Sequence, residues 1–290
     1  MNVPLPRFAI AAIACVVQLH AQTARPKAAP ATPQLEAVSP IVSQFEDGAA
    51  LEGGQKFVVG ESGFFRFSVV NFKASEAGKV QLSGHCQVFD SRGVPIAPVD
   101  DLNIVTALSE EDKNWRPRFH FQFQIPAIAP PGVYKIHFDV TDEQLHQTAS
   151  GDTTFGVDGV NVPPSDNLVI RHITFYRNAD DEVPLSIIAY RPGDAIWIRF
   201  DITGYKHGEQ NAIDVSYDVA VTDAAGKQLF AQENAATEKS QAFYPQPWVP
   251  GSFSLTLQPD TARAVYAVTI TAHDAIGRQT ASEKAEFRVE

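Results

Sequence analysis

The residues of this chain that could carry chemistry are scattered carboxylates, histidines and a few aromatic side chains. The sequence contains no Gly-rich phosphate loop after a strand and no G-x-S-x-G, H-E-x-x-H or C-x-x-C motif. These motifs place a nucleophile, a metal or a phosphate where a reaction needs it. We therefore predict no catalytic residue, no cofactor and no enzymatic activity.

Acidic side chains are the first candidates for binding a metal. Four aspartates recur at equivalent turns and strand ends, namely Asp90, Asp223, Asp142 and Asp274. The acidic loops 110–112 and 180–182 add further carboxylates, and calcium at domain ends is one interpretation. Aspartate is also favoured in turns because its side chain caps backbone N–H groups, and neither loop has the ligand spacing of a calcium loop. We favour capping and predict no metal site.

Histidines are the second candidates. Alternation would put His120 and His137 on the solvent side of adjacent strands, with His146 nearby in sequence. The second half of the chain has no corresponding pair. We therefore interpret these histidines as solvated surface residues and not as metal ligands.

The most unusual stretch is 243–251, which reads FYPQPWVPG. Tyr244 and Trp248 could stack on a sugar face or on a partner side chain. They could equally fold back over a sandwich edge or over the crevice between two domains. Trp115 precedes the corresponding strand of the first half, which favours a shared structural role. These three residues are the candidate contacts for a partner or a glycan.

The elements that position these residues occur twice. FRFSVVNFK at 65–73 and IRFDITGYK at 198–206 lie 133 positions apart, and the next strands align at the same offset. After a one-residue slip, Gln147–Ser150 matches Gln279–Ser282 letter for letter. Cys86 falls opposite Val219, so we interpret it as a small core residue. We conclude that the chain contains a duplicated domain.

Short alternating segments indicate strands. The clearest are 119–125 and 134–140, where apolar side chains occupy every second position. Weaker segments predict a first strand at 41–45, a return strand at 94–96 and a hairpin strand at 228–230. Turn signals about every ten residues predict two tandem antiparallel β-sandwiches of about seven strands each, in an all-β fold. We expect domains at 38–160 and 165–290, joined by the Pro-stiffened linker 161–165.

The segment Val133–Asp142 follows a Pro-Gly turn and reads VYKIHFDVTD, and Tyr266–Asp274 is its partner. These segments resemble the penultimate strand of immunoglobulin-like and fibronectin type III-like modules of exported bacterial proteins. The resemblance covers both repeats and implies extracellular binding, spacing or display. It implies no catalytic residue. The chain departs from antibody domains because it has no paired core cysteines.

The N-terminus predicts export. Residues 1–21 carry one basic residue, an apolar run and Ala21, which is typical of a signal peptide cleaved before Gln22. A competing interpretation lipidates Cys15. Residues 22–37 are rich in Ala and Pro and predict a spacer. We expect a periplasmic or extracellular protein with no transmembrane anchor.

Composition limits the partners. The chain has 290 residues, of which 44% are hydrophobic and 20% are charged, which is typical of globular proteins. Its net charge of −11 disfavours nucleic acid and anionic membranes. The sequence therefore predicts a non-enzymatic binding or spacer protein whose partner is an unidentified extracytoplasmic protein or glycan. The alternative is an accessory carbohydrate-binding protein that uses Tyr244 and Trp248.

Overall fold

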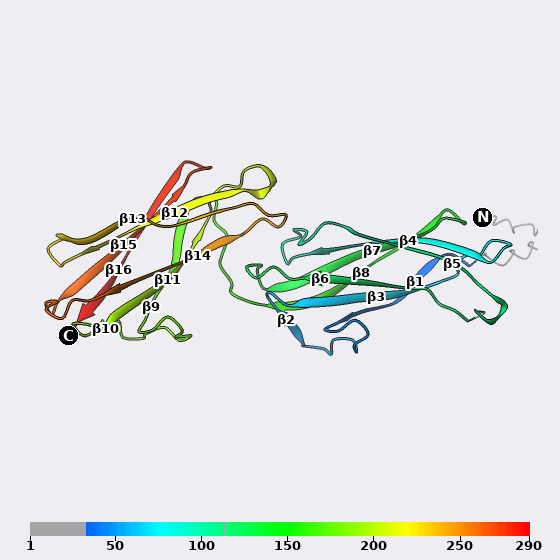
Figure 1. Cartoon of the computed structure of the whole chain (residues 1–290), viewed down its shortest axis with the longest axis horizontal. Coiled ribbons are helices and arrows are strands. Elements are labelled where there is room, and N and C mark those ends of the chain that lie inside the picture. Colours follow the sequence, from blue (N-terminus) through cyan, green and yellow to red (C-terminus); the bar gives the residue numbers. More distant parts are fainter. Residues whose placement is uncertain (1–32, 113) are drawn as a thin grey trace, which may run out of the picture. The chain divides into compact units, whose positions relative to one another are not determined.

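The computed structural model describes residues 33–112 and 114–290. The predicted signal peptide, its cleavage site, Cys15 and most of the predicted spacer lie outside the described residues. Everything that follows concerns the described part of the chain, which is an all-β fold of two β-sandwiches (Figure 1).

In the described residues of 36–158, strands form the first sandwich. In chain order they are β1 (Glu36–Ser43), β2 (Lys56–Val58), β3 (Ser62–Val70), β4 (Lys79–Phe89), β5 (Asp100–Ala107), β6 (Arg118–Gln124), β7 (Gly132–Asp142) and β8 (Gln147–Asp158). A three-stranded sheet has the order β1-β3-β6, and a five-stranded sheet has the order β2-β8-β7-β4-β5. The 3-10 turn η1 (Glu110–Asp112) precedes β6.

The second sandwich, within 169–289, repeats this arrangement. Its strands are β9 (Val169–Tyr176), β10 (Ala189–Tyr190), β11 (Ala195–Thr203), β12 (Ile213–Thr222), β13 (Gln228–Ser240), β14 (Trp248–Thr256), β15 (Val265–Asp274) and β16 (Gln279–Val289). The sheet orders are β14-β11-β9 and β10-β16-β15-β12-β13. The turn η2 (Glu209–Asn211) precedes β12. Each sandwich is antiparallel apart from one short parallel pairing, β2 with β8 and β10 with β16.

Alternation of apolar and polar residues explains these strands. Along β6 the phenylalanines are buried, whereas the intervening His and Gln side chains are more exposed, as the sequence predicts. Because successive side chains of a strand point to opposite faces, such a pattern buries one face of each sheet against the other. The first core is rich in phenylalanine, with Phe57, Phe65, Phe67, Phe119, Phe121, Phe123, Phe138 and Phe155.

Strand register agrees with the duplication inferred from the sequence. Phe65 of β3 lies opposite Phe121 of β6, and Ile198 of β11 lies opposite Phe253 of β14. Backbone conformation repeats as well. Positive φ angles occur at the matched pairs Ser39 and His172, Gly60 and Gly193, Asn71 and Gly204, Gly93 and Gly226, and His146 and Arg278. A side chain rarely adopts this conformation, so its recurrence shows that the two sandwiches share turns and bulges.

A buried tyrosine begins the penultimate strand in both sandwiches. The Tyr134 hydroxyl donates a hydrogen bond to the Pro130 carbonyl at 2.8 Å, and the Tyr266 hydroxyl donates one to the Ala262 carbonyl at 2.7 Å. Both bonds reach back four residues. Each therefore secures the turn that leads into the strand.

The strands differ from the sequence prediction in their limits. β1 begins at Glu36, inside the predicted spacer, because the Leu35 N–H donates to the Gln147 side chain and Asn71 Nδ2 donates to the Gln34 carbonyl. Residues 94–96 contribute only an isolated bridge between Phe89 and Pro95. β13 extends to Ser240, well beyond the predicted strand at 228–230. The sequence did not reveal this length because the exposed side chains of β13 show no alternation.

Candidate functional site

The stretch 243–251 folds back onto the protein. Tyr244 and Trp248 are only 7% and 5% exposed, whereas Phe243 is 49% exposed. Trp248 already belongs to β14, where it lies opposite Thr203 of β11. The edge position of β14 accommodates Pro250, which has no N–H to donate to a further strand. Two of the three predicted contact rings are thus covered, and the exposed ring of this stretch is that of Phe243.

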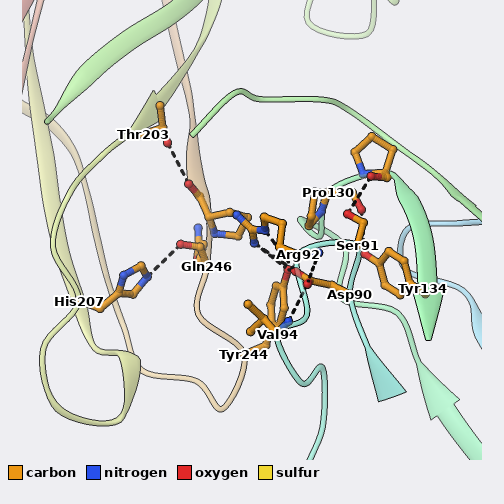
Figure 2. Close-up of polar contacts among 12 residues, drawn as sticks. Asp90, Ser91, Arg92, Val94, Pro130, Tyr134, Thr203, His207, Tyr244 and Gln246 are labelled. Atoms are coloured by element: carbon orange, nitrogen blue, oxygen red, sulfur yellow. Dashed lines mark hydrogen bonds and ion pairs between the residues drawn. The ribbon is translucent and has the colours of Figure 1, made fainter. Parts of the chain in front are cut away.

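Tyr244 contacts the hairpin turn of the first sandwich (Figure 2). Its hydroxyl donates a hydrogen bond to Asp90 Oδ2 at 2.8 Å and accepts one from Arg92 Nη2 at 3.2 Å. The Tyr244 side chain is part of the buried core cluster of the first sandwich, although it follows β13 of the second. The contact therefore joins residues of both sandwiches.

Asp90 is held for this contact by its own turn. Its Oδ1 accepts hydrogen bonds from the Arg92 and Val94 backbone N–H groups, both at 2.8 Å, and its Oδ2 accepts one from Arg92 Nη2 at 3.2 Å. The carboxylate side chain is fully buried. Burial and the neighbouring Asp90 carboxylate raise the pKa of the Tyr244 hydroxyl above its ordinary value, so it stays protonated as a donor.

Backbone carbonyls of this Pro-rich stretch accept hydrogen bonds from side chains of the second sandwich. The Gln246 carbonyl accepts a hydrogen bond from the Tyr205 hydroxyl at 2.6 Å. It also lies 3.0 Å from His207 Nε2 (Figure 2). The Thr203 hydroxyl donates to the Pro247 carbonyl at 3.1 Å. Side chains of the second sandwich thus fix the loop that carries Tyr244.

Trp115 occupies a different environment. It is half-buried and packs edge-on against Phe72, with ring centroids 5.8 Å apart, beside the first core. The structure places Tyr244 in the loop before β14 and Trp248 at the start of β14, whereas Trp115 lies on the first sandwich alone.

An open cavity of about 750 Å³ lies beside this loop. We call it the Phe243 cavity; its lining residues are Val94, Pro95, Gln210, Asn211, Gln241, Ala242, Phe243 and Pro245. The lining comes from both sandwiches and contains no charged residue. Such a lining provides apolar contact and amide hydrogen bonds, but no group that transfers protons at neutral pH.

The repeated aspartates cap backbone groups. Asp142 accepts hydrogen bonds from the N–H groups of Lys73, Gln144 and Leu145, and Asp274 accepts them from those of Lys206, Ile276 and Gly277. Asp223 caps its hairpin turn as Asp90 does. In residues 33–112 and 114–290, no group of three or more His, Cys, Asp or Glu side chains could hold a metal ion.

The predicted histidine candidates lie apart. His120 belongs to β6 of the three-stranded sheet, whereas His137 belongs to β7 of the five-stranded sheet, so the expectation of adjacent strands is wrong. The reason is that the turn between these strands crosses from one sheet to the other. His137 Nδ1 instead pairs with Asp152 Oδ1 at 2.7 Å.

Cys86 is buried in the first core. Burial raises the pKa of its thiol to about 12. Because the thiolate is the reactive form, the side chain is inert at neutral pH. It fills core volume, as its match to Val219 indicates.

Comparisons with known proteins leave the family open. No family model and no curated protein matches the chain. Solved structures with some similarity include the C-terminal domain of the Streptococcus pyogenes antigen I/II-family protein AspA, with 10% identity, a TM-score of 0.30 and coverage of 87% of this chain and 99% of that chain. The C-terminal domain of the Streptococcus agalactiae antigen I/II polypeptide BspA has 11% identity, a TM-score of 0.29 and coverage of 86% and 100%.

A third structure is the Pseudomonas fluorescens alkylpurine DNA glycosylase AlkC bound to DNA containing an abasic site analog. It has 12% identity and a TM-score of 0.28, and the match covers 43% of this chain and 30% of the glycosylase. Similarities of this size carry no inference about function. Among the described residues, no helix has the length and apolar character that crossing a membrane requires.

Proposed function

We propose that this chain is an exported, non-enzymatic protein in which two immunoglobulin-like modules, at 38–160 and 165–290, form one binding or spacer unit. The signal-peptide pattern of residues 1–21 supports export. Partners of such a protein are extracytoplasmic proteins or glycans.

The strand arrangement supports the immunoglobulin-like class. Both sandwiches pair a three-stranded sheet with a five-stranded sheet in the same order. In both, a tyrosine at the start of the penultimate strand donates its hydroxyl proton to a carbonyl four residues upstream, as in the tyrosine corner of immunoglobulin-like domains. The modules lack the core disulfide of antibody domains.

The observation that carries the spacer role is the buried contact between Tyr244 and Asp90. A loop of the second module inserts its ring into the first core and completes the hydrogen bonding of a buried carboxylate. Losing that contact would leave the Asp90 carboxylate short of a partner, which is unfavourable in a buried site. The short linker 161–165, with two adjacent prolines, adds stiffness. Together these features restrict motion between the modules.

Pulsed electron spin resonance tests this restriction. Spin labels are attached at the exposed positions Gln81 and Lys284, each replaced by cysteine, in a Cys15→Ser background. The labelled protein is diluted with unlabelled protein, so that the measurement reports the distribution of distances between the two modules of one molecule. We expect a narrow distribution for the otherwise wild-type chain and a broad one after Tyr244→Phe combined with Asp90→Ala. Tyr266→Phe removes a comparable hydroxyl within one module and should leave the distribution narrow. A broad distribution without the Tyr244 and Asp90 changes would disprove the rigid spacer.

The carbohydrate alternative receives no support from Tyr244 and Trp248 themselves. Both rings are covered, so neither presents a face on which a sugar could stack. Stacking of a ligand on an aromatic ring of this stretch must use the ring that remains exposed, which is Phe243.

A further inference from the structure

The Phe243 cavity has the chemistry of a ligand site. Its volume of about 750 Å³ falls within the range of roughly 300–1,000 Å³ that small-molecule sites occupy. One wall carries the half-exposed Phe243 ring between Ala242 and the buried Tyr244, and Val94 and Pro95 add apolar surface. Figure 2 shows Val94 beside Tyr244.

Three side-chain amides supply the polar part of the cavity. Gln241 Nε2 donates to Gln210 Oε1 at 2.5 Å, and Asn211 Nδ2 donates to the Phe243 carbonyl at 2.6 Å. Each amide has one oxygen acceptor and two N–H donors. The internal bonds therefore orient the amides but leave the Gln210 amide nitrogen and the Gln241 and Asn211 amide oxygens with capacity for a ligand. Donors and acceptors stand side by side, next to an aromatic ring.

Backbone strain marks the same residues. Gln210 and Asn211 have φ angles of 53° and 57°. The position equivalent to Asn211 in the first sandwich is Gly78, whose φ is 72°, and Ala77 corresponds to Gln210. Glycine adopts this conformation without strain, whereas a side chain rarely does. The second sandwich therefore places the Asn211 side chain in a conformation that the first sandwich accommodates with Gly78, and it adds a second positive φ at Gln210.

The combination selects a ligand class. An aromatic face packs against the C–H face of a sugar ring, and hydroxyls need neighbouring groups that both donate and accept hydrogen bonds, which amides do. No charged residue lines the cavity, so nothing there compensates a phosphate, a carboxylate or an ammonium group. A neutral, hydroxyl-rich molecule matches both features.

We propose that the Phe243 cavity binds a neutral oligosaccharide, which stacks on Phe243 and bonds to Gln210, Asn211 and Gln241. This inference rests on the binding part of the proposed function. The spin-label distances test the spacer part separately, so either part can fail alone. In the first sandwich, Ala107 holds the strand register position of Gln241, so this amide has no equivalent there.

Isothermal titration with the full chain tests the proposal. The probes are cello-, malto-, chito- and manno-oligosaccharides, with an oligogalacturonate as the acidic comparison and an Ala-Pro repeat peptide as the alternative ligand. We expect saturable binding of at least one neutral oligosaccharide and none of the other two probes. Phe243→Ala should weaken that binding by about tenfold or more, since the stacking surface is lost.

Asn211→Gly separates ligand binding from folding. Glycine tolerates the positive φ, and this relief offsets the loss of the hydrogen bond from Asn211 to the Phe243 carbonyl, so the variant should keep a thermal stability close to that of the wild type while it weakens sugar binding. Phe45→Ala removes an exposed ring from the first sandwich and should leave binding unchanged. Binding of no neutral oligosaccharide, binding of the peptide alone, or unchanged binding in both Phe243→Ala and Asn211→Gly would overturn the proposal.

Discussion

The two sandwiches fill the same layer of their cores from opposite strands. In the first, Phe119 of β6 lies over Gly84 of β4, where an added Cβ would come within 2.6 Å of the phenylalanine ring. In the second, the equivalent positions are Gly251 of β14 and Tyr217 of β12, whose ring packs edge-on against Phe200. One large and one small residue have exchanged places across the two sheets.

This exchange shows what duplication preserves. A core tolerates changes that conserve its volume much better than changes that add or remove it. The two sandwiches therefore keep the summed volume of the pair while they change which strand supplies it. Cross-sheet pairs, rather than single positions, are the units in which these cores have diverged.

The exchange predicts a large loss and a partial rescue. Tyr217→Gly removes a buried ring that packs against Phe200 and leaves a cavity beside it, so it should destabilise the second sandwich by at least about 3 kcal/mol. Gly251→Phe on the same chain recreates the arrangement of the first sandwich and should recover part of that loss. Hydrogen exchange with mass spectrometry measures the two sandwiches separately.

The single variant Gly251→Phe is the matched control. With Tyr217 present, its side chain would collide with the Phe200 ring, so it should destabilise by about 1–3 kcal/mol. The rescue requires the double variant to be more stable than Tyr217→Gly. If the two single losses simply add, the pair does not share one layer.

A feature that the sandwiches share should respond alike in both. Asp142 and Asp274 are buried, and each carboxylate accepts two backbone N–H bonds from the turn that follows it and one from the segment after β3 or β11. Asp142→Ala and Asp274→Ala leave those N–H groups without their acceptor. Each variant should destabilise its own sandwich by about 2–3 kcal/mol, as measured by the same exchange experiment.

Asp→Asn at each position keeps one oxygen acceptor and should be less harmful than Asp→Ala. The two sandwiches should also rank the variants in the same order. A cost confined to one sandwich would show that the repeated carboxylate caps a turn in both but stabilises only one.

Much of this fold was predictable because it depends on local alternation and on a repeated offset. The inward residues of β3, β6 and β7, the duplication and the capping aspartates follow from spacing alone. The site was not predictable in the same way. Tyr244 and Asp90 are 154 residues apart, and nothing in either segment indicates the other.

The sequence did not reveal which aromatic side chain of the stretch 243–251 is exposed to solvent. A sequence shows that Phe243, Tyr244 and Trp248 are clustered, but not which ring turns inward. The carbonyl bonds that fold the loop come from Thr203, Tyr205 and His207, which precede it by some forty residues. The amides of η2 were missed because Gln and Asn in a loop carry no pattern; a positive φ is visible only in the structure.

The outer sheet faces offer the mildest contrast. His85 of β4 pairs with Asp139 of β7 through Nδ1 and Oδ1 at 2.8 Å, whereas the equivalent of His85 is Asp218, which pairs with His273 at 2.8 Å. The hydrogen bond to Asp139 raises the pKa of His85 above 6.5. The backbone N–H of Asn234, followed by the His273 hydrogen bond, lowers the pKa of Asp218 below 3.8.

These shifts predict opposite pH windows. Because the folded pKa of His85 is raised, its stabilisation is fully present below pH 6.5 and disappears as the pH rises through the folded pKa. The pKa of Asp218 is depressed, so its contribution is present above pH 3.8 and disappears as the pH falls through the folded pKa. His85→Gln should therefore destabilise the first sandwich at pH 5 but not at pH 8.5. Asp218→Asn should destabilise the second sandwich at both pH values. Each loss should be about 0.2–1 kcal/mol, because both pairs are partly exposed. Urea unfolding at the two pH values measures this, and a loss for His85→Gln that is equal at both would assign His85 a packing role instead of a charge.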